Sequence, residues 1–247
     1  LPTKGSIQID GEPLTRKNDR LKRKLSVVTQ EYSMRQDMTM DEIMEYQGRL
    51  YYMPLKKIRE RSEELLDFCG LLDYRKRTVR KLSGGMKRKL MVCRALLTEP
   101  EILLLDEPTA GMDALARRQM WNLLKKLNQQ NLTILLTTHY MEEAVNAGYV
   151  VILDKGSVAA EGTPFELKND YVQDIVSVYG VSEDEIKSLN REYKKIRDGY
   201  QIKVRNTKEA TKLIVEHQDL FMDYEVVKGG MDDVFLAVTG KKLGGER

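Results

Sequence analysis

The middle of the chain alternates between short apolar runs and longer segments with helical periodicity. Residues 102–105 and 132–137 are apolar runs, which are typical of strands buried on both faces of a parallel sheet. The segment 114–130 lies between them and has the apolar spacing of an amphipathic helix. Strands that alternate with helices predict a layered α/β fold with a mostly parallel sheet.

Two earlier regions complete the predicted first domain. Short strands are expected over 5–11, which ends in an Asp-Gly turn, and over 25–29. The basic segment 16–24 between them is expected to be a solvated helix or loop. From 38 to 97 the apolar residues recur at helical spacing, which predicts a helical subdomain.

The last third of the chain has a different character. The segments 149–153 and 157–160 flank an Asp-Lys-Gly sequence and predict a β-hairpin. Charged residues of both signs dominate 182–197, which predicts a surface helix. The remaining pattern predicts strand, helix, strand and helix in turn, over 201–204, 207–217, 224–227 and 231–238. We therefore predict a first domain over 1–165 and a small α+β domain over 166–247.

The composition excludes several classes of protein. Among the 247 residues 41% are hydrophobic and 32% are charged, which suits a globular chain with a sizeable core. No apolar run is long enough to span a bilayer, and no signal sequence opens the chain. The two cysteines are too few for a disulfide framework or a zinc cluster. A net charge of +3 is too small to indicate a nucleic-acid partner.

Two adjacent carboxylates, Asp106 and Glu107, follow the apolar run 102–105. Charge at the end of a buried strand is costly unless it is paired or binds a metal, and such strand ends face the ligand crevice of a parallel sheet. Asp106 is predicted to help hold a magnesium ion, and Glu107 to orient or deprotonate a water molecule. Taken alone, the pair is also compatible with an ordinary charged loop.

Two further elements suit a bound phosphate. In Ser83-Gly84-Gly85 the glycines permit a close backbone approach, and the serine can cap a following helix whose free N–H groups attract anions. His139, one of two histidines, closes the strand after Glu107 and is predicted to contact a phosphate nearby. Gln30 closes an early strand and is the weakest of these signals; the Ser-Gly-Gly string alone also fits a plain turn.

Together these residues resemble the ATP-binding cassette (ABC) ATPases, the nucleotide-binding subunits of ABC transporters. The sequence Leu-Ser-Gly-Gly-Met at 82–86 resembles the signature motif of that family, and 102–107 resembles the Walker B strand with its catalytic glutamate. The sequence Ala-Gly-Met-Asp at 110–113 resembles the D-loop, Gln30 the Q-loop residue and His139 the switch histidine. These motifs stand in the family's order.

The resemblance implies a P-loop NTPase-like cassette that binds ATP and Mg²⁺ and hydrolyses ATP. It implies that Glu107 acts on the attacking water, that His139 holds the γ-phosphate and that Asp106 and Gln30 hold the magnesium ion. The residues expected to contact nucleotide are Gln30, Ser83, Gly84, Gly85, Asp106 and Asp113.

The resemblance also implies partners. Two cassettes, as a homodimer, would sandwich two ATP molecules head to tail, with each signature motif facing the nucleotide of the other cassette. The helical subdomain would dock on a separate transmembrane permease. The chain is accordingly expected in the cytoplasm, bound at the inner face of the membrane.

One motif of the family is missing from these residues. The phosphate-binding pattern G-x-x-x-x-G-K-[ST] does not occur, and the single Gly-Lys pair, Gly240-Lys241, has Phe235 where the first glycine would stand. Because Leu1 is not methionine, we expect the sequence to begin inside a longer cassette, after its phosphate loop. The alternative is a naturally degenerate cassette that lends its signature motif to a partner. Under both, the chain as given is expected to bind ATP poorly and not to hydrolyse it.

The segments 137–144 and 231–240 resemble the cassettes that pair with ABC-2-type permeases, among them the daunorubicin-resistance group. This implies export and leaves the cargo open. A soluble ABC-type ATPase that acts on DNA or ribosomes is the rival from another class. The chain has neither the sustained heptads nor the zinc cysteines of such proteins, so no nucleic-acid partner is predicted.

Overall fold

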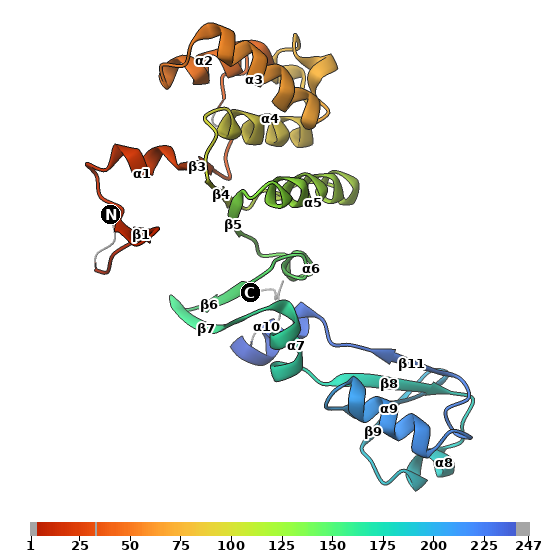
Figure 1. The fold of residues 1–247 in the computed structure, drawn as a ribbon. Coiled ribbons are helices and arrows are strands. Elements are labelled where there is room, and N and C mark those ends of the chain that lie inside the picture. The colour runs from red at the N-terminus through yellow and green to blue at the C-terminus, as the bar shows by residue number, and fades with distance from the viewer. Residues whose placement is uncertain (1–3, 33, 241–247) are drawn as a thin grey trace. The chain divides into compact units, whose positions relative to one another are not determined.

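The computed structural model of the chain describes residues 4–32 and 34–240 (Figure 1). Leu1 and Lys241, both named above, lie outside the described residues. The chain divides into two compact units, Leu1–His139 and Tyr140–Arg247. Within the described ranges, no helix has the length and apolar character needed to cross a membrane. The predicted domain boundary between 165 and 166 stays a prediction.

The first unit is built on a parallel three-stranded sheet. Its strands, in spatial order, are β3 (Leu25–Val28), β4 (Ile102–Asp106) and β5 (Thr133–Thr137). The register pairs Leu25 with Ile102 and Asp106 with Thr137, so the strands end together at one edge. The α/β class and the parallel sheet expected from the apolar runs are confirmed.

Helices cover one face of this sheet. The four helices concerned are α2 (Met40–Leu50), α3 (Leu55–Phe68), α4 (Gly84–Leu96) and α5 (Ala114–Gln129). The helix α4 contacts β3, α5 contacts β5, and α2 and α3 pack on α4. The helical segment between α3 and α4 continues as two short 3₁₀ turns, η1 (Leu72–Tyr74) and η2 (Val79–Lys81). Helices fill most of the range 38–97, as its apolar spacing predicted.

The two faces of the sheet differ because successive side chains of a strand point in opposite directions. Val28, Leu103 and Leu105 are buried in the core beneath the helices. On the opposite face Val27 is 56% exposed and Leu135 is 65% exposed. Among the described residues β5 pairs only with β4, so its other edge is open.

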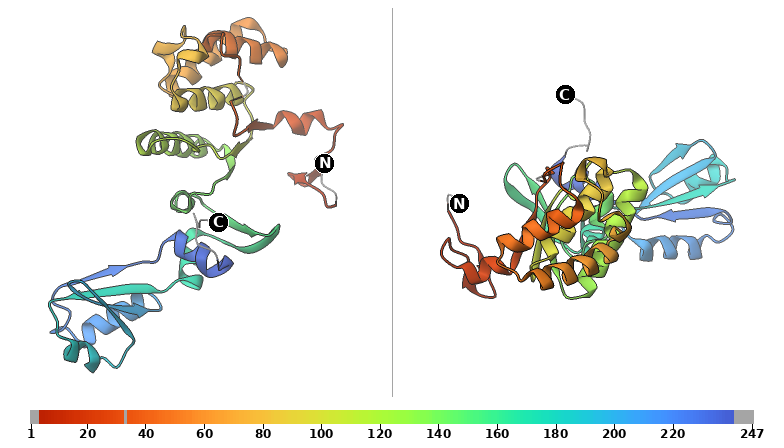
Figure 2. Two further views of the ribbon diagram at one scale, coloured as in Figure 1. Left: turned by 180° about the vertical axis from the view of Figure 1, so that it is seen from behind. Right: turned by 90° about the horizontal axis from the view of Figure 1, so that it is seen from above.

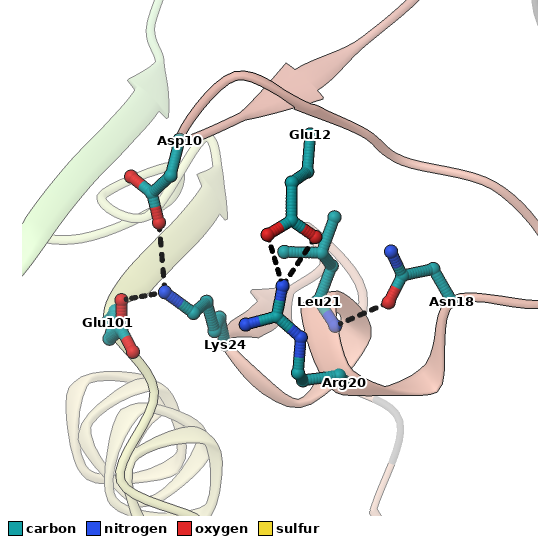
Figure 3. Close-up of polar contacts among 7 residues, drawn as sticks. All are labelled: Asp10, Glu12, Asn18, Arg20, Leu21, Lys24 and Glu101. Atoms are coloured by element: carbon teal, nitrogen blue, oxygen red, sulfur yellow. Dashed lines mark hydrogen bonds and ion pairs between the residues drawn. The ribbon is translucent and has the colours of Figure 1, made fainter.

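A small hairpin and a short helix precede the sheet: β1 (Gln8–Ile9), β2 (Glu12–Pro13) and α1 (Asp19–Arg23). Figure 3 shows how they are tied to the start of the sheet. The ammonium group of Lys24 donates to Asp10 and to Glu101, at 2.8 Å each, and the guanidinium of Arg20 donates to Glu12. The basic segment therefore forms a short helix, and its residues Arg20, Lys22 and Lys24 make ion pairs within the chain.

The second unit begins with a two-layered part. An antiparallel hairpin of β6 (Val150–Asp154) and β7 (Ser157–Gly162) forms where the Asp-Lys-Gly turn predicted one. Three helices belong to this part: α6 (Met141–Ala144), α7 (Pro164–Tyr171) and α10 (Met231–Thr239). Ile152 of the hairpin, Leu167 of α7 and Val234 of α10 meet in one small core.

The rest of the second unit is a four-stranded antiparallel sheet with two helices (Figure 2). The elements are β8 (Asp174–Tyr179), α8 (Glu183–Ser188), β9 (Tyr193–Ile196), β10 (Gly199–Val204), α9 (Thr207–Glu216) and β11 (Tyr224–Val227). The spatial order β11-β8-β10-β9 with this β-α-β-β-α-β sequence is the ferredoxin-like arrangement.

One helix prediction is wrong in part. The charged segment 182–197, expected as one surface helix, forms only the short helix α8 and then the strand β9. Asn190 takes a left-handed φ of 50°, which ends the helical course of the backbone. Beyond it Tyr193 packs against the core beside Tyr200, at 5.5 Å between ring centroids, while Lys194 and Lys195 stay exposed. Pairing with β10 therefore outweighs the local helical pattern.

Candidate functional site

Three of the predicted side chains meet at the carboxyl ends of the parallel strands. Gln30 follows β3, Glu107 follows β4 and His139 follows β5. The amide nitrogen Nε2 of Gln30 donates to Oε2 of Glu107 at 3.0 Å, and Nδ1 of His139 lies 3.0 Å from Oε1 of the same carboxylate. Both carboxylate oxygens of Glu107 are thus engaged from opposite sides, and its side chain remains 27% exposed. The arrangement suits a carboxylate that orients a water molecule.

Asp106, the neighbour of Glu107, is held by a different strand. The hydroxyl group of Thr137 donates to Oδ1 of Asp106 at 2.6 Å, and the same hydroxyl oxygen accepts the backbone N–H of Glu107 at 3.1 Å. Sequence reasoning assigned no role to Thr137 beyond the strand. Its place at the end of that strand, two residues before His139, is the signal that was available.

The backbone of Glu107 is strained. Its φ of 43° lies in the left-handed region, which costs a non-glycine residue free energy unless surrounding contacts hold it there. This turn of the backbone follows directly on the last strand residue, Asp106. Such outliers cluster at functional sites, which agrees with the placement of Glu107 among the other predicted residues.

Arg88 of α4 lies beneath this cluster and was missed by the sequence reasoning. Its side chain is buried, and its guanidinium donates to the carbonyl oxygens of Thr29 at 2.7 Å, Gln30 at 2.8 Å and Glu107 at 3.5 Å. Burial lowers the pKa of Arg88, while the negative charges of Asp106 and Glu107 oppose the decrease. An arginine within a run of basic residues gave no sequence signal of burial.

The residues of the Ser-Gly-Gly string lie at the start of α4 and not among the strand ends. The hydroxyl oxygen of Ser83 accepts the backbone N–H of Met86 at 3.2 Å, which is the N-cap expected of it. Ser83 and Gly84 are exposed and Gly85 is half-buried. The amino end of this helix is therefore open to an anionic ligand from outside the chain.

Asp113 occupies a similar position at the next helix. Its Oδ1 atom accepts the backbone N–H of Ala116 at 2.8 Å and caps α5. This helix cap is the contact that the structure gives Asp113; a contact with nucleotide stays a prediction.

No group of three or more histidine, cysteine or acidic side chains in the described ranges could hold a metal ion by itself. Magnesium bound with a nucleotide needs only one or two protein oxygens, because phosphates and waters supply the rest. Asp106 offers a carboxylate at the strand ends, and its hydrogen bond from Thr137 fixes one of its oxygens. The donor set therefore fits magnesium that arrives with ATP.

Comparison with known proteins identifies the class. The sequence profile described as "ABC transporter" matches residues 1–110. The Nod factor export ATP-binding protein I of Cupriavidus metallidurans is 33% identical over 249 aligned positions, which cover 98% of this chain and 81% of that protein. The chain belongs to the ABC transporter family, as one of its ATP-binding proteins.

Two further proteins are similar over shorter regions. The daunorubicin/doxorubicin resistance ATP-binding protein DrrA of Streptomyces peucetius is 38% identical over 169 residues, 68% of this chain and 51% of that protein. The solved structure of cbiO1 from Clostridium perfringens, described as part of the ABC transporter complex cbiONQ, has a TM-score of 0.63 and 25% identity. It covers 68% of this chain and 70% of that one. The predicted cassette fold is confirmed, and so is the function of an ABC transporter's nucleotide-binding subunit.

Proposed function

We propose that this chain couples ATP binding and hydrolysis to export through a separate permease of the ABC-2 type. The observation that carries the proposal is the carboxylate of Glu107, held between Gln30 and His139 at the ends of three parallel strands. The relatives, an export protein and a drug-resistance protein by name, support export over a role on DNA or ribosomes. Because those names point to different cargoes, the proposal leaves the cargo open.

Within this proposal each residue has a distinct task. Glu107 accepts a proton from, or orients, the water that attacks the γ-phosphate, and His139 contacts that phosphate. Gln30 registers the nucleotide through its hydrogen bond to Glu107. Asp106, with Gln30, supports magnesium, which neutralises charge on the phosphates when bound. Asp113 completes the nucleotide contacts from the start of α5.

The exposed start of α4 supports a head-to-tail pair of cassettes. Within the described residues, the hydrogen bonds of the Glu107 carboxylate come from Gln30 and His139. The hydroxyl group of Ser83 caps its own helix, α4. Free N–H groups at the amino end of α4 would instead bind the ATP of a second cassette, which we propose to be another copy of the chain.

The helical subdomain supplies the surface for the permease. The residues Tyr46, Leu50, Tyr51 and Tyr52 at the end of α2 are large, apolar and 49–93% exposed. Such amphipathic aromatic side chains are typical of the core of a protein interface. Docking there would place the chain in the cytoplasm, against the inner face of the membrane.

The 247 residues contain no G-x-x-x-x-G-K-[ST] loop. Since that loop supplies the amides and the lysine that cradle the phosphates, we propose that a polypeptide of these residues alone binds ATP poorly and does not hydrolyse it. Turnover by the purified 247-residue chain would contradict this proposal. A phosphate loop encoded directly upstream would support a longer active cassette, and its absence there would support the degenerate alternative.

Glu107→Gln in the full-length protein tests the proposed reaction. The variant keeps the shape of the side chain and loses its basicity, so kcat for ATP should fall by at least about 100-fold while KM changes little. The readout is phosphate release by the cassette purified with its permease. Glu101→Gln is the matched control, because Glu101 lies at the opposite end of β4, away from the site, and its carboxylate forms an ion pair with Lys24. Equal kcat for Glu107→Gln and the unmodified protein would refute the assignment.

A further inference from the structure

Arg88 makes an unusual set of contacts for a buried cation. It is 2% exposed, and its guanidinium is held by three backbone carbonyls, those of Thr29, Gln30 and Glu107. A buried charge is costly unless its hydrogen-bonding capacity is used, and Nε of Arg88 has no partner within residues 4–32 and 34–240. Burying Arg88 therefore costs folding free energy that an apolar side chain of similar size at this position would not cost.

The carbonyls that Arg88 holds belong to the residues of the site. Gln30 and Glu107 themselves present their main chain to the guanidinium, and Thr29 precedes Gln30. Gln30 and Glu107 are far apart in the sequence, and their side chains form a direct hydrogen bond of 3.0 Å. One guanidinium nitrogen, Nη2, donates to the carbonyl oxygens of both residues, and the other, Nη1, donates to Thr29. This planar, forked group fixes the spacing over which the hydrogen bond between Gln30 and Glu107 forms.

Arg88 also helps to hold the strained backbone conformation of Glu107. The left-handed φ of 43° persists only if neighbouring groups hold the peptide on both sides. Thr137 accepts the N–H of Glu107, and Arg88 donates to its carbonyl oxygen. The carboxylate is thus aimed by two residues that do not touch it.

Tyr32 makes a second connection between the segment 29–32 and α4. Its ring centroid lies 5.3 Å from the guanidinium carbon of Arg88, and its hydroxyl group donates to the carbonyl oxygen of Gly84 at 3.3 Å. The segment 29–32 is therefore attached to α4 at Gly84, in the signature motif, and again at Arg88, one turn further on.

We propose that Arg88 is a positioning residue that couples the signature helix α4 to the Gln30–Glu107 pair of the same chain, with Tyr32 as the second attachment. A displacement of α4 moves the backbone of both residues and so changes the aim of the Glu107 carboxylate. This role rests on the proposed function of Glu107, but the mechanical coupling itself does not require ATP hydrolysis.

Hydrogen exchange on the 247-residue chain tests the coupling without nucleotide. In Arg88→Lys the charge remains but the fork is lost, so the amides of residues 29–32, of Glu107 and of Thr109 should exchange about 10-fold faster or more. Lys89→Gln is the matched control, because Lys89 is the next residue of α4 and its ammonium group contacts Gln119 instead. Unchanged exchange at both segments in a folded Arg88→Lys protein would overturn the proposal.

A second variant covers the case in which Arg88→Lys fails to fold. Tyr32→Phe keeps the ring over the guanidinium and removes the hydroxyl that contacts Gly84. Exchange should then rise at residues 29–32, with the thermal midpoint nearly unchanged. Exchange at 29–32 equal to that of the unmodified chain would count against the second attachment and against the proposal.

Kinetics of the full-length protein separate positioning from mere stability. Arg88→Lys should lower kcat about 10-fold with less than about 3-fold change in KM for ATP, and should add nothing in a Glu107→Gln background. Independent, multiplicative effects of the two substitutions would overturn the proposal. If Glu107→Gln itself leaves kcat intact, the proposed function fails, and the exchange measurement still decides the coupling.

Discussion

Glu107 is held by residues from three separate stretches of the chain. Its side chain contacts Gln30 and His139, and its backbone contacts Thr137 and Arg88. Gln30 and His139 were predicted as site residues because their residue types and positions match a family motif, and His139 was expected near Glu107. The backbone partners were not, since a hydrogen bond to a carbonyl or an N–H group leaves no residue-specific pattern in the partner that is held.

Thr137→Val tests how much of the site depends on such a backbone partner. Valine keeps the shape of threonine and removes the hydroxyl, so Asp106 loses its donor and the N–H of Glu107 its acceptor. We expect the Mg²⁺ concentration for half-maximal ATPase activity of the full-length protein to rise about 10-fold or more, because partners that orient a metal ligand have effects of this size.

Thr133→Val is the control for this experiment. Thr133 lies on the same strand, four residues earlier, and is exposed at the end of β5 away from the site. It should leave the Mg²⁺ dependence unchanged. A similar shift for both variants, or none for Thr137→Val, would show that the hydroxyl of Thr137 does not orient Asp106.

At the scale of elements, a helix predicted from the sequence formed where its apolar residues make a continuous buried stripe. The segment 114–130 forms α5 nearly as expected, since Met120, Leu123, Leu124 and Leu127 give it a continuous apolar stripe. The segment 182–197 has few apolar residues to fix its period, and edge pairing with β10 decides its second half. Weak local patterns are overridden by tertiary contacts.

Gly199→Ala tests the packing of the antiparallel sheet. A Cβ atom at Gly199 would lie 2.0 Å from the carbonyl oxygen of Val178, and a backbone oxygen in a paired strand cannot move aside cheaply. The substitution should lower the free energy of unfolding by about 1–3 kcal/mol, as for other overpacked sites. Urea unfolding followed by circular dichroism measures it.

Gly148→Ala is the matched control, because a Cβ atom there meets nothing within 4 Å, the residue is exposed and it lies outside the helices and strands. Its effect should be within about 0.5 kcal/mol. Equal stabilities of the two variants would mean that the sheet relaxes around Gly199 and that the packing argument is wrong.

At the scale of the molecule, the second unit forms two hydrophobic cores from its own residues. One core surrounds Val176 and Ile202 of the ferredoxin-like part, and the other surrounds Ile152 and Val234 beside the hairpin. Residues 140–247 expressed alone should therefore fold cooperatively, with a single thermal transition and dispersed amide resonances.

Val176→Asp provides the control for the fragment. Val176 is completely buried, so an unpaired carboxylate there should abolish the transition. A fragment without a cooperative transition, or one that tolerates Val176→Asp, would mean that this unit does not form its core independently.

The sequence by itself determined the α/β class and the order of the motifs along the chain, and it predicted Gln30, Glu107 and His139 as site residues. Apolar runs report burial, and polar residues placed directly after them report the strand ends. Only the tertiary structure decided that 182–197 breaks into a helix and a strand. Only the structure, too, revealed that Arg88 and Thr137 form hydrogen bonds with the backbone of the site residues. These features arise from backbone hydrogen bonds between distant segments, which the folded chain brings together and no local spacing encodes.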